Sequence, residues 1–414
     1  MKVTHIGTAD TLGGAAQASF ALHCGLLARG IDSRMVVNQM RENRPEISRV
    51  GWSRDWLPAR IAERAVLELE TLTGFQYQIQ PWRRQIPNHP FVKDADVIHL
   101  HNLHGNFFAT ELLAELSTIA PLVWSLYDTW ALTGHCSYNY DCDRWKIGCG
   151  QCPNLEEYPP IKIDRTAALW RNKKRLYAIA QPTFIAPSKW MFEMIRSSRL
   201  MTDRCATRQI PHGIDTDFWQ SIGRGKAREI LGIPNDRFVV MAIGGIRKGV
   251  DVLVRALSRL IGIDVLSAGS EGVPGATYPQ GECSLEHLRI CYSAADVFVM
   301  PSLAETMGLM VMQAMSCGLP VIGSDVGGIP DLIEHARTGF LVEPGDSEEL
   351  RHRLGRMPFY RETIARMGER GRARIVDHFS IGWHVEQHIQ LYESVLRRPR
   401  GYPDPLVLQT ASGG

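Results

Sequence analysis

The sequence lacks the features that mark membrane-spanning, secreted and nucleic-acid-binding proteins. No run of 18 apolar residues occurs, so no membrane-spanning helix is expected. The opening MKVTHIGTAD has neither the basic region nor the long apolar stretch of a signal peptide. The 46 Lys and Arg nearly balance the 44 Asp and Glu, so no net field attracts nucleic acid. These absences favour a cytoplasmic protein with no nucleic-acid partner.

What the chain does contain is enough material for two globular domains. Its 414 residues exceed the length at which one hydrophobic core usually stops growing, and 44% of them are hydrophobic. Nine cysteines, an odd number spread along the chain, argue against a disulfide framework in a reducing compartment.

Short apolar runs alternate with longer helical patterns along the chain, which predicts βαβ units and parallel sheets. In the first half, strands are predicted at 2–7, 33–37, 97–101, 122–126 and 183–186. In the second half, they are predicted at 238–242, 264–267, 297–300, 320–323 and 339–342. The fold class is therefore α/β, with two doubly wound, Rossmann-like domains.

The segment QIPHGIDTDFW (209–219) interrupts the periodicity and is the expected hinge. We therefore predict a first domain at 1–208, containing a cysteine-rich loop at 135–153, and a second domain at 209–378. The remainder, 379–414, is expected to form a helix over 383–397 that packs back on the first domain, followed by a frayed tail.

Residues 41–93 fit the alternation poorly and mix basic with aromatic side chains. The basic and aromatic members are Arg41, Arg44, Arg49, Arg54, Arg60, Arg64, Arg83, Arg84, Trp52, Trp56, Phe75, Tyr77 and Trp82. Such a mixture suits peripheral contact with a membrane or a phosphate-bearing acceptor. Six acidic residues lie in the same stretch, so an ordinary helical insertion is the favoured interpretation.

Two glycine-rich turns follow predicted strands, at the edge where parallel sheets bind ligands. In GTADTLGGAA (7–16), Gly13 and Gly14 let backbone amides approach an anion before a helix that should begin near Ala15. The G-x-G-x-x-G fingerprint is absent, so a structural turn explains this segment equally well. In GGIRKG (244–249), Arg247 and Lys248 oppose the helix dipole, which favours an anionic ligand over a solvated loop.

Polar side chains follow three further strands. PSLAETMGLMVMQ (301–313) places Glu305 in a strand-to-helix connection, where it could orient sugar hydroxyls or simply complement the helix dipole. DVIHLHN (96–102) and WSLYDTW (124–130) gather His, Tyr, Asp and Trp at two strand ends. Strand alternation puts His99 and His101 on one sheet face, so His99 could be a core histidine, and Asp128 could be a helix cap.

These motifs, in this order, resemble the family 4 retaining glycosyltransferases. The segments that carry the resemblance are GGAA, DVIHLHN, WSLYDTWALTGHC, FIAPSKWM, PHGID, RKG and AADVFVMPSLAETMGLMVMQAMSCGLPVIGSDVGGIPDLI. The arrangement TGHC...CDRWKIGCGQCP resembles the branch with colanic-acid-type exopolysaccharide transferases. The resemblance implies a GT-B fold in which two Rossmann-like domains face a cleft. The first domain would hold the acceptor, and the second would hold a nucleotide-diphosphate sugar.

The resemblance also implies an activity and a set of roles. The activity is retaining transfer of a hexose-type sugar to a lipid-linked or saccharide acceptor in cell-surface polysaccharide biosynthesis, at the inner face of the plasma membrane. Arg247 and Lys248 would stabilise the departing phosphates and Glu305 would bind sugar hydroxyls. The other donor-binding positions would be Gly13, Gly14, Gly308, Leu309, Met310 and Gln313. No cofactor is required for catalysis, because a guanidinium and an ammonium can replace Mg²⁺.

Two positions depart from the family pattern. Tyr127 stands where His is usual, and with an ordinary pKa of about 10 it is a poor proton acceptor, so a base role would move to His101 or His135. Gln313 stands where Glu is usual, although an amide can still bind a ribose diol. A catalytically silent sugar-nucleotide-binding paralogue, or a partner subunit of a transferase, is therefore the alternative function. A sugar-nucleotide epimerase is a third.

Four cysteines lie within the first-domain loop, at Cys136, Cys142, Cys149 and Cys152. Their spacing is C-x5-C-x6-C-x2-C, of which only the last pair is typical of zinc sites. Four thiolates can close a structural zinc site that holds a loop without a core of its own. Two disulfides, or four free thiols, are the alternatives. None of these arrangements is catalytic, because a closed site offers no position for substrate.

Overall fold

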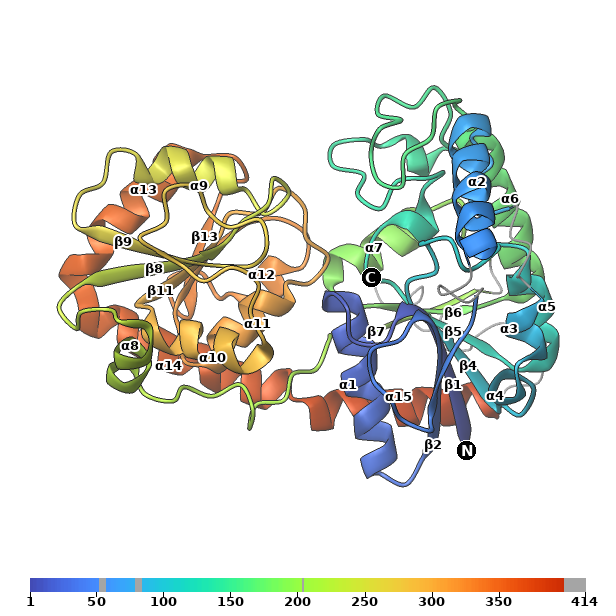
Figure 1. The fold of residues 1–414 in the computed structure, drawn as a ribbon, viewed down its shortest axis with the longest axis horizontal. Coiled ribbons are helices and arrows are strands. Elements are labelled where there is room, and N and C mark those ends of the chain that lie inside the picture. The colour runs from blue at the N-terminus through green and yellow to red at the C-terminus, as the bar shows by residue number, and fades with distance from the viewer. Residues whose placement is uncertain (52–56, 79–83, 203–204, 398–414) are drawn as a thin grey trace, which may run out of the picture. The chain divides into compact units, whose positions relative to one another are not determined.

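The computed structural model describes residues 1–51, 57–78, 84–202 and 205–397. The chain divides into two compact units: Met1–Pro211 with His384–Gly414 form unit 1, and His212–Trp383 form unit 2. Each unit contains one parallel sheet with helices on both faces (Figure 1). The predicted α/β class with two Rossmann-like sheets is confirmed. The division of acceptor and donor binding between the units stays a prediction.

The sheet of unit 1 has the strand order β3-β2-β1-β4-β5-β6-β7, and all its pairings are parallel. The strands are β1 (Lys2–Ala9), β2 (Asp32–Gln39), β3 (Ile47–Arg49), β4 (Val97–Leu100), β5 (Leu122–Ser125), β6 (Thr183–Ala186) and β7 (Ala206–Gln209). Strands β3 and β7 lie outside the ranges predicted from the sequence. Both are short edge strands, ISR and ATRQ, with too few apolar residues to give a periodic signal.

The helices of unit 1 are α1 (Gly14–Ala28), α2 (Leu57–Thr73), α3 (Gln85–Asn88), α4 (Pro90–Lys93), α5 (Leu112–Ile119), α6 (Thr166–Ala180) and α7 (Lys189–Ser197), with short 3-10 turns η1 (Trp130–Leu132) and η2 (Arg144–Lys146). The closing helix α15 (Ile381–Leu396) also packs on this unit. Gly25 of α1 lies so close to Val385 that a Cβ would come within 2.4 Å of its Cγ2. A side chain at this position would push the two helices apart.

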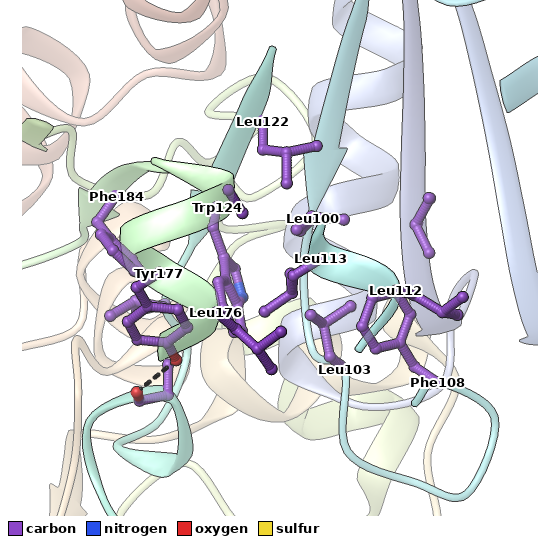
Figure 2. Packing of buried hydrophobic residues seen from close by; sticks show 14 of the residues in the cluster. Leu100, Leu103, Phe108, Leu112, Leu113, Leu122, Trp124, Leu176, Tyr177 and Phe184 are labelled. Carbon is purple, nitrogen blue, oxygen red and sulfur yellow. Dashed lines mark hydrogen bonds between the residues drawn. The ribbon is translucent and has the colours of Figure 1, made fainter. Parts of the chain in front are cut away.

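The two faces of this sheet bury different chemistry. One face packs an apolar cluster in which Trp124 stacks on Phe184 at 5.6 Å and meets Tyr177 edge-on (Figure 2). Alternation along β4 sends Ile98 and Leu100 into this cluster. The intervening His99 points to the opposite face, where Tyr392 of α15 is hydrogen-bonded to its Nδ1 at 2.7 Å.

The sheet of unit 2 has the order β10-β9-β8-β11-β12-β13 and is also parallel. Its strands are β8 (Phe238–Ile243), β9 (Ile263–Ala268), β10 (Tyr278–Pro279), β11 (Val297–Met300), β12 (Val321–Ser324) and β13 (Gly339–Val342). Its helices are α8 (Arg224–Leu231), α9 (Val250–Leu257), α10 (Leu285–Ala294), α11 (Leu309–Ser316), α12 (Ile329–Leu332), α13 (Ser347–Arg356) and α14 (Arg361–His378), with η3 (Met357–Tyr360). Residues of β8 alternate between the two cores, because Val239 and Met241 face one and Val240 faces the other.

The irregular segment 41–93 is partly described. It contains β3, α2, α3 and α4. The structure does not describe five of its predicted aromatic and basic residues, Trp52, Arg54, Trp56, Trp82 and Arg83. The predicted tail, 399–414, also lies outside the described residues. Helix α2 buries only Ala59 and Glu70 and exposes Leu57, Ile61 and Leu72 by 56–63%. Within the described residues, no helix has the length and apolar character needed to cross a bilayer.

Candidate functional site

Each sheet reverses its strand order at one point, between β1 and β4 in unit 1 and between β8 and β11 in unit 2. Open parallel sheets bind ligands outside the carboxyl ends of the strands at such a switch point. The loops that follow these four strands contain most of the residues singled out from the sequence.

The loop after β8 is held against the end of β11 by a close backbone contact. Gly249 has φ +76°, and a Cβ there would lie 1.8 Å from the carbonyl oxygen of Pro301. The amide of Leu303 donates to the carbonyl of Arg247 at 2.9 Å. Only glycine permits this approach, which brings the Arg247 and Lys248 side chains to the strand end that carries Glu305.

Glu305 accepts from both neighbouring cations. Its Oε2 accepts from Lys248 Nζ, and Arg247 Nη1 lies 3.5 Å from the same oxygen. Arg247 also donates to the carbonyl of Ala304 at 2.9 Å. The Glu305 and Lys248 side chains are only 10% and 14% exposed, so solvent screens this triad weakly. One carboxylate and two cations leave a formal charge of +1 at the switch point.

The surroundings favour the ionised form of Glu305 in this triad. Burial alone would raise the pKa of Glu305, but the charges of Lys248 and Arg247 outweigh it, and the pKa of the carboxyl is lowered. Burial lowers the pKa of Lys248 from its ordinary value, and the Glu305 carboxylate opposes that effect. The triad therefore favours a carboxylate at Glu305, and pairing with that carboxylate limits the fall in the pKa of Lys248.

The amino end of α11 lies next in the chain after Glu305. Gly308 precedes the helix with φ +98°, and no side chain caps the first turn, which also lacks acidic residues. The amide of Gly328 donates to the carbonyl of Glu305 at 3.2 Å and fixes the connection. The uncapped amides at Leu309 and Met310 can therefore bind an anion, as helix amino ends commonly do.

Gln313 lies deeper than the resemblance implies. It is 4% exposed, in the second turn of α11, and its Oε1 accepts from the hydroxyl of Tyr292 at 3.2 Å. Glu305 and Gln313 do not share the helix, because α11 begins only at Leu309. A ribose contact by Gln313 stays a prediction that this placement does not favour.

The loop after β1 in unit 1 also leads from a strand through a glycine into a helix, but it has no basic pair like Arg247 and Lys248. Gly13, with φ +89°, caps α1, which begins at Gly14. The buried carboxylate of Asp10 shapes the turn, because its Oδ2 accepts from the amides of Arg41 and Glu42 at 2.7 and 2.8 Å. No side chain caps this helix, so its first amides are also suited to an anion.

His101 and Tyr127 belong to a buried hydrogen-bond chain. His101 Nδ1 is bonded to the Tyr127 hydroxyl at 3.0 Å, and its Nε2 is bonded to His5 Nδ1 at 2.9 Å. His5 Nε2 is bonded in turn to Ser33 at 3.1 Å. Burial raises the pKa of Tyr127. Because both ring nitrogens of His101 are engaged and the residue is 3% exposed, the structure does not favour it as a base for an acceptor.

His135, the second candidate base, lies in the cysteine-rich loop. Its Nδ1 is bonded to the carbonyl of Pro159 at 3.1 Å and its Nε2 to Cys152 Sγ at 3.4 Å. Burial lowers its pKa. This placement gives His135 a structural role in holding the loop.

The sequence analysis missed a histidine and carboxylate pair at the ends of β4 and β5. His104 Nε2 lies 2.6 Å from Asp128 Oδ2, and Thr8 Oγ1 donates to the carbonyl of His104 at 2.6 Å. Asp128 Oδ1 accepts from the amide of Trp130 at 2.9 Å, but Thr129 is the cap residue of η1, so Asp128 is not the helix cap that the sequence allowed. A cavity of about 10 Å³ lies beside both side chains. His104 and Asp128 are 24 residues apart in the sequence, so the pair is visible only once the fold brings their two loops together.

Residues 237–357 match the glycosyl transferases group 1 family. A protein of Escherichia coli K12 named as a colanic acid biosynthesis glycosyl transferase, WcaC, is 26% identical over 72% of this chain and 76% of its own length. Several further curated relatives match over only 38–56% of their length.

Two solved structures share the fold. Sucrose-phosphate synthase from Thermosynechococcus elongatus superposes with a TM-score of 0.69 at 21% identity, over 95% of this chain and 98% of that one. Anabaena HepE, solved in complex with UDP-glucose, superposes with a TM-score of 0.65 at 18% identity, over 95% and 100%. These likenesses confirm the GT-B fold.

Proposed function

We propose that the chain is a retaining hexosyltransferase of the group 1 glycosyltransferase family, on the basis of the family match over residues 237–357 and the similarity to WcaC. Its donor is a nucleotide-diphosphate sugar, and its acceptor is a lipid-linked or free saccharide of a cell-surface polysaccharide. The proposal draws on the polysaccharide role in the name of its relative WcaC and on the UDP-glucose bound to HepE.

The observation that carries the proposal is the triad of Lys248, Arg247 and Glu305 at the β8 and β11 switch point. A net positive, weakly screened group beside an uncapped helix amino end suits a diphosphate. In the proposed complex the two cations and the amides of Leu309 and Met310 bind phosphate oxygens. Glu305 holds the cations in place and binds sugar hydroxyls with its remaining acceptor capacity.

In the proposed reaction the bond between the anomeric carbon and the diphosphate oxygen breaks, and its electron pair leaves with the nucleoside diphosphate. The acceptor oxygen bonds to the same face of the sugar, and its proton passes to a departing phosphate oxygen. Lys248 and Arg247 stabilise the negative charge that develops on the diphosphate, as metal ions do in other enzymes. No protein nucleophile is required when donor and acceptor are positioned on one side.

Unit 1 is proposed to bind the acceptor. The His104 and Asp128 pair offers a hydrogen bond to an acceptor hydroxyl at the ends of β4 and β5. The exposed stripe of Leu57, Ile61 and Leu72 on α2 is proposed to rest on the inner face of the plasma membrane, beside Arg60 and Arg64. Membrane contact would bring a lipid-linked acceptor to the enzyme.

A panel of UDP-, GDP- and dTDP-sugars tests the proposal. We expect the full chain to hydrolyse one donor slowly, with release of the nucleoside diphosphate. Lys248→Ala should lower this rate about 10²- to 10³-fold, because it removes a preorganised charge from the leaving group. The matched control is Lys226→Ala, which removes an exposed lysine of α8 in the same unit and should leave the rate unchanged.

Other outcomes would assign other functions. Donor binding in a thermal-shift assay without turnover would indicate the silent paralogue. A changed sugar with its nucleotide intact would indicate the epimerase. Equal rates of donor hydrolysis for Lys248→Ala and Lys226→Ala would show that the triad takes no part in the reaction.

A further inference from the structure

The four cysteines of the 136–152 loop face one small cavity. Cys136, Cys142, Cys149 and Cys152 all line it, and its volume is about 20 Å³. A cavity of that size, lined by groups that can act as ligands, has room for one water molecule or one ion. All nine cysteines of the chain lie in its described part, each as a free thiol.

We propose that these four cysteines bind one Zn²⁺ as thiolates and that the ion holds the 136–152 loop on unit 1. On binding, four S–H bonds lose their protons to solvent and four Zn–S bonds form, with no change in oxidation state. The loop must tighten to do so, because no three of the thiols lie within 4.8 Å of one another. The metal would hold the loop together in place of regular secondary structure, since η2 is the only helix or strand between Cys136 and Cys152, all of whose residues the structure describes.

The backbone is arranged to present sulfur atoms. Cys149, Gly150 and Gln151 all have positive φ, at 54°, 91° and 47°, which makes a tight turn between the last two cysteines. The amide of Gly134 donates to Cys149 Sγ at 3.2 Å, and Asp164 Oδ2 accepts from the amide of Cys152 at 2.8 Å.

A buried lysine supplies the matching charge. Lys173 is 3% exposed, and its Nζ donates to the carbonyls of Trp130 and Thr133 at 2.5 and 3.0 Å. It forms no ion pair with a carboxylate in the described part of the chain. Burial lowers the pKa of Lys173 to about 7, and Asp128 opposes that effect. A zinc ion with four thiolates would carry a formal charge of −2 and would therefore favour the ammonium form of this buried lysine.

Two other groups of metal-binding side chains are weaker candidates. His5, His99 and His101 lie within reach of one ion, but their ring nitrogens are already hydrogen-bonded to one another, to hydroxyls or to both. The cluster of Cys283, His287 and Cys291 has three ligands, and Gln280 occupies His287 Nε2 at 2.8 Å. This cysteine and histidine cluster serves as the control for the four-cysteine site.

Metal analysis of the purified full chain tests the proposal. We expect about one zinc per chain after dialysis against metal-free buffer. Cys142→Ser should lower that content at least severalfold, whereas Cys283→Ser, which removes a cysteine from the control cluster, should leave it unchanged. Zinc below a tenth of an equivalent in the wild type would overturn the proposal, as would a loss caused by Cys283→Ser alone.

A second measurement keeps the test decisive if Cys142→Ser does not fold. The wild-type chain is loaded with Co²⁺, whose absorption distinguishes a tetrahedral four-thiolate site from other ligand sets. Titration of all thiols under denaturing, metal-free conditions should count nine. Thiolate-to-cobalt absorption with nine thiols supports the site, and five thiols with no such absorption would indicate two disulfides instead.

The role of Lys173 is tested by its removal. Lys173→Met should weaken zinc retention against a chelator roughly 10-fold or more, as loss of an outer partner of a metal site does. Lys174→Met changes the exposed neighbour on α6 and should have no effect. Equal zinc retention in the two variants would assign Lys173 a packing role only.

Discussion

The two units differ in the polar side chains that they bury. Unit 2 buries charges in pairs: Arg228 is fully buried and donates to Asp296 Oδ2 at 2.8 Å, and Lys248 pairs with Glu305. Unit 1 also buries Asp10 and Lys173, but one face of its sheet carries a layer of buried histidines. The histidines of that layer are His5, His23, His99, His101, His384 and His388.

This difference determines whether a change in pH or a mutation should destabilise each unit more. A buried ion pair keeps its charges over a wide pH range and fails mainly when one partner is removed. A buried neutral histidine fails when the solution supplies a proton, because a charged imidazole in the interior lacks solvation. Unit 1 should therefore be sensitive to acid and unit 2 to mutation of its pairs.

Acid should produce the largest effect. Burial lowers the pKa of His23 and of His384 to about 4, whereas the unfolded chain takes up those protons near pH 6.5. The unfolded state therefore binds more protons below pH 6.5, and stability falls as the pH drops from 6.5 toward 4. At pH 4.5 the loss is roughly 2 kcal/mol for each of these two histidines. His5 and His99 add to it in the same direction.

Hydrogen exchange measured at pH 7 and pH 4.5, corrected for intrinsic rates, distinguishes the units. Amides of β4 should lose protection, whereas amides of β8 should keep theirs. Glu305 and Asp264 have lowered pKa values and stay ionised over this window. Equal loss of protection in the two strands would contradict the contrast between the units.

Removal of the buried guanidinium should have the next largest effect. Arg228 donates to Asp296 and to the carbonyls of Ala294 and Asn235, so Arg228→Met removes the buried charge that pairs with Asp296 and the donor to these carbonyls. We expect a loss of about 3–5 kcal/mol in the free energy of unfolding of unit 2. Denaturant titration with a probe in unit 2 measures it.

The same carboxylate provides the control. Arg224 also pairs with Asp296, at 2.8 Å, but its side chain is 53% exposed. Arg224→Met should cost less than about 1 kcal/mol, because solvent screens that pair. Similar losses for both variants would mean that burial does not decide the strength of these pairs.

The parts of the molecule that the sequence predicted are those encoded locally. The ranges expected for β6, β11 and β13 match the structure, because each is a short run of apolar or β-branched residues between turn signals. The position of Glu305 in a strand-to-helix connection was also found from local pattern. Local pattern could not show that Glu305 contacts Lys248, 57 residues away.

The pairings of the histidine layer were hidden for the same reason. His5 and His101 are separated by 96 residues and meet only because β1 and β4 are neighbours across a crossover. The β1–β4 pairing also sets which imidazole reaches which partner. The sequence pattern gives the sheet face of His99 and His101. It does not give the hydrogen bonds that join His101 to His5 and Tyr127, or the bond between His104 and Asp128.

Asp128→Asn tests the role proposed for the His104 and Asp128 pair of unit 1 in binding the acceptor. The amide keeps the shape of the side chain and its bond to Trp130, but it no longer offers His104 a carboxylate. We expect about a tenfold loss of transfer to a saccharide acceptor, equivalent to about 1.4 kcal/mol, with donor hydrolysis unchanged. Rates of transfer and of hydrolysis, measured on one preparation with polyprenyl-linked and free saccharides, separate the two. A parallel loss of both rates would place Asp128 in general stability instead.

Gln313→Glu should have the smallest effect and tests whether unit 2 tolerates a further buried charge beside its donor site. A carboxylate can accept the hydrogen bond from Tyr292 as Gln313 Oε1 does, at 3.2 Å and with the same side-chain length. Because Gln313 is 4% exposed, its interior position weighs against a direct ribose contact, so we expect the KM for the donor to change less than about threefold, or about 0.6 kcal/mol. A tenfold fall in that KM would instead show that position 313 contacts the nucleotide. Unit 2 would then accept a buried carboxylate without a cationic partner, which would weaken the contrast between its ion pairs and the histidine layer of unit 1.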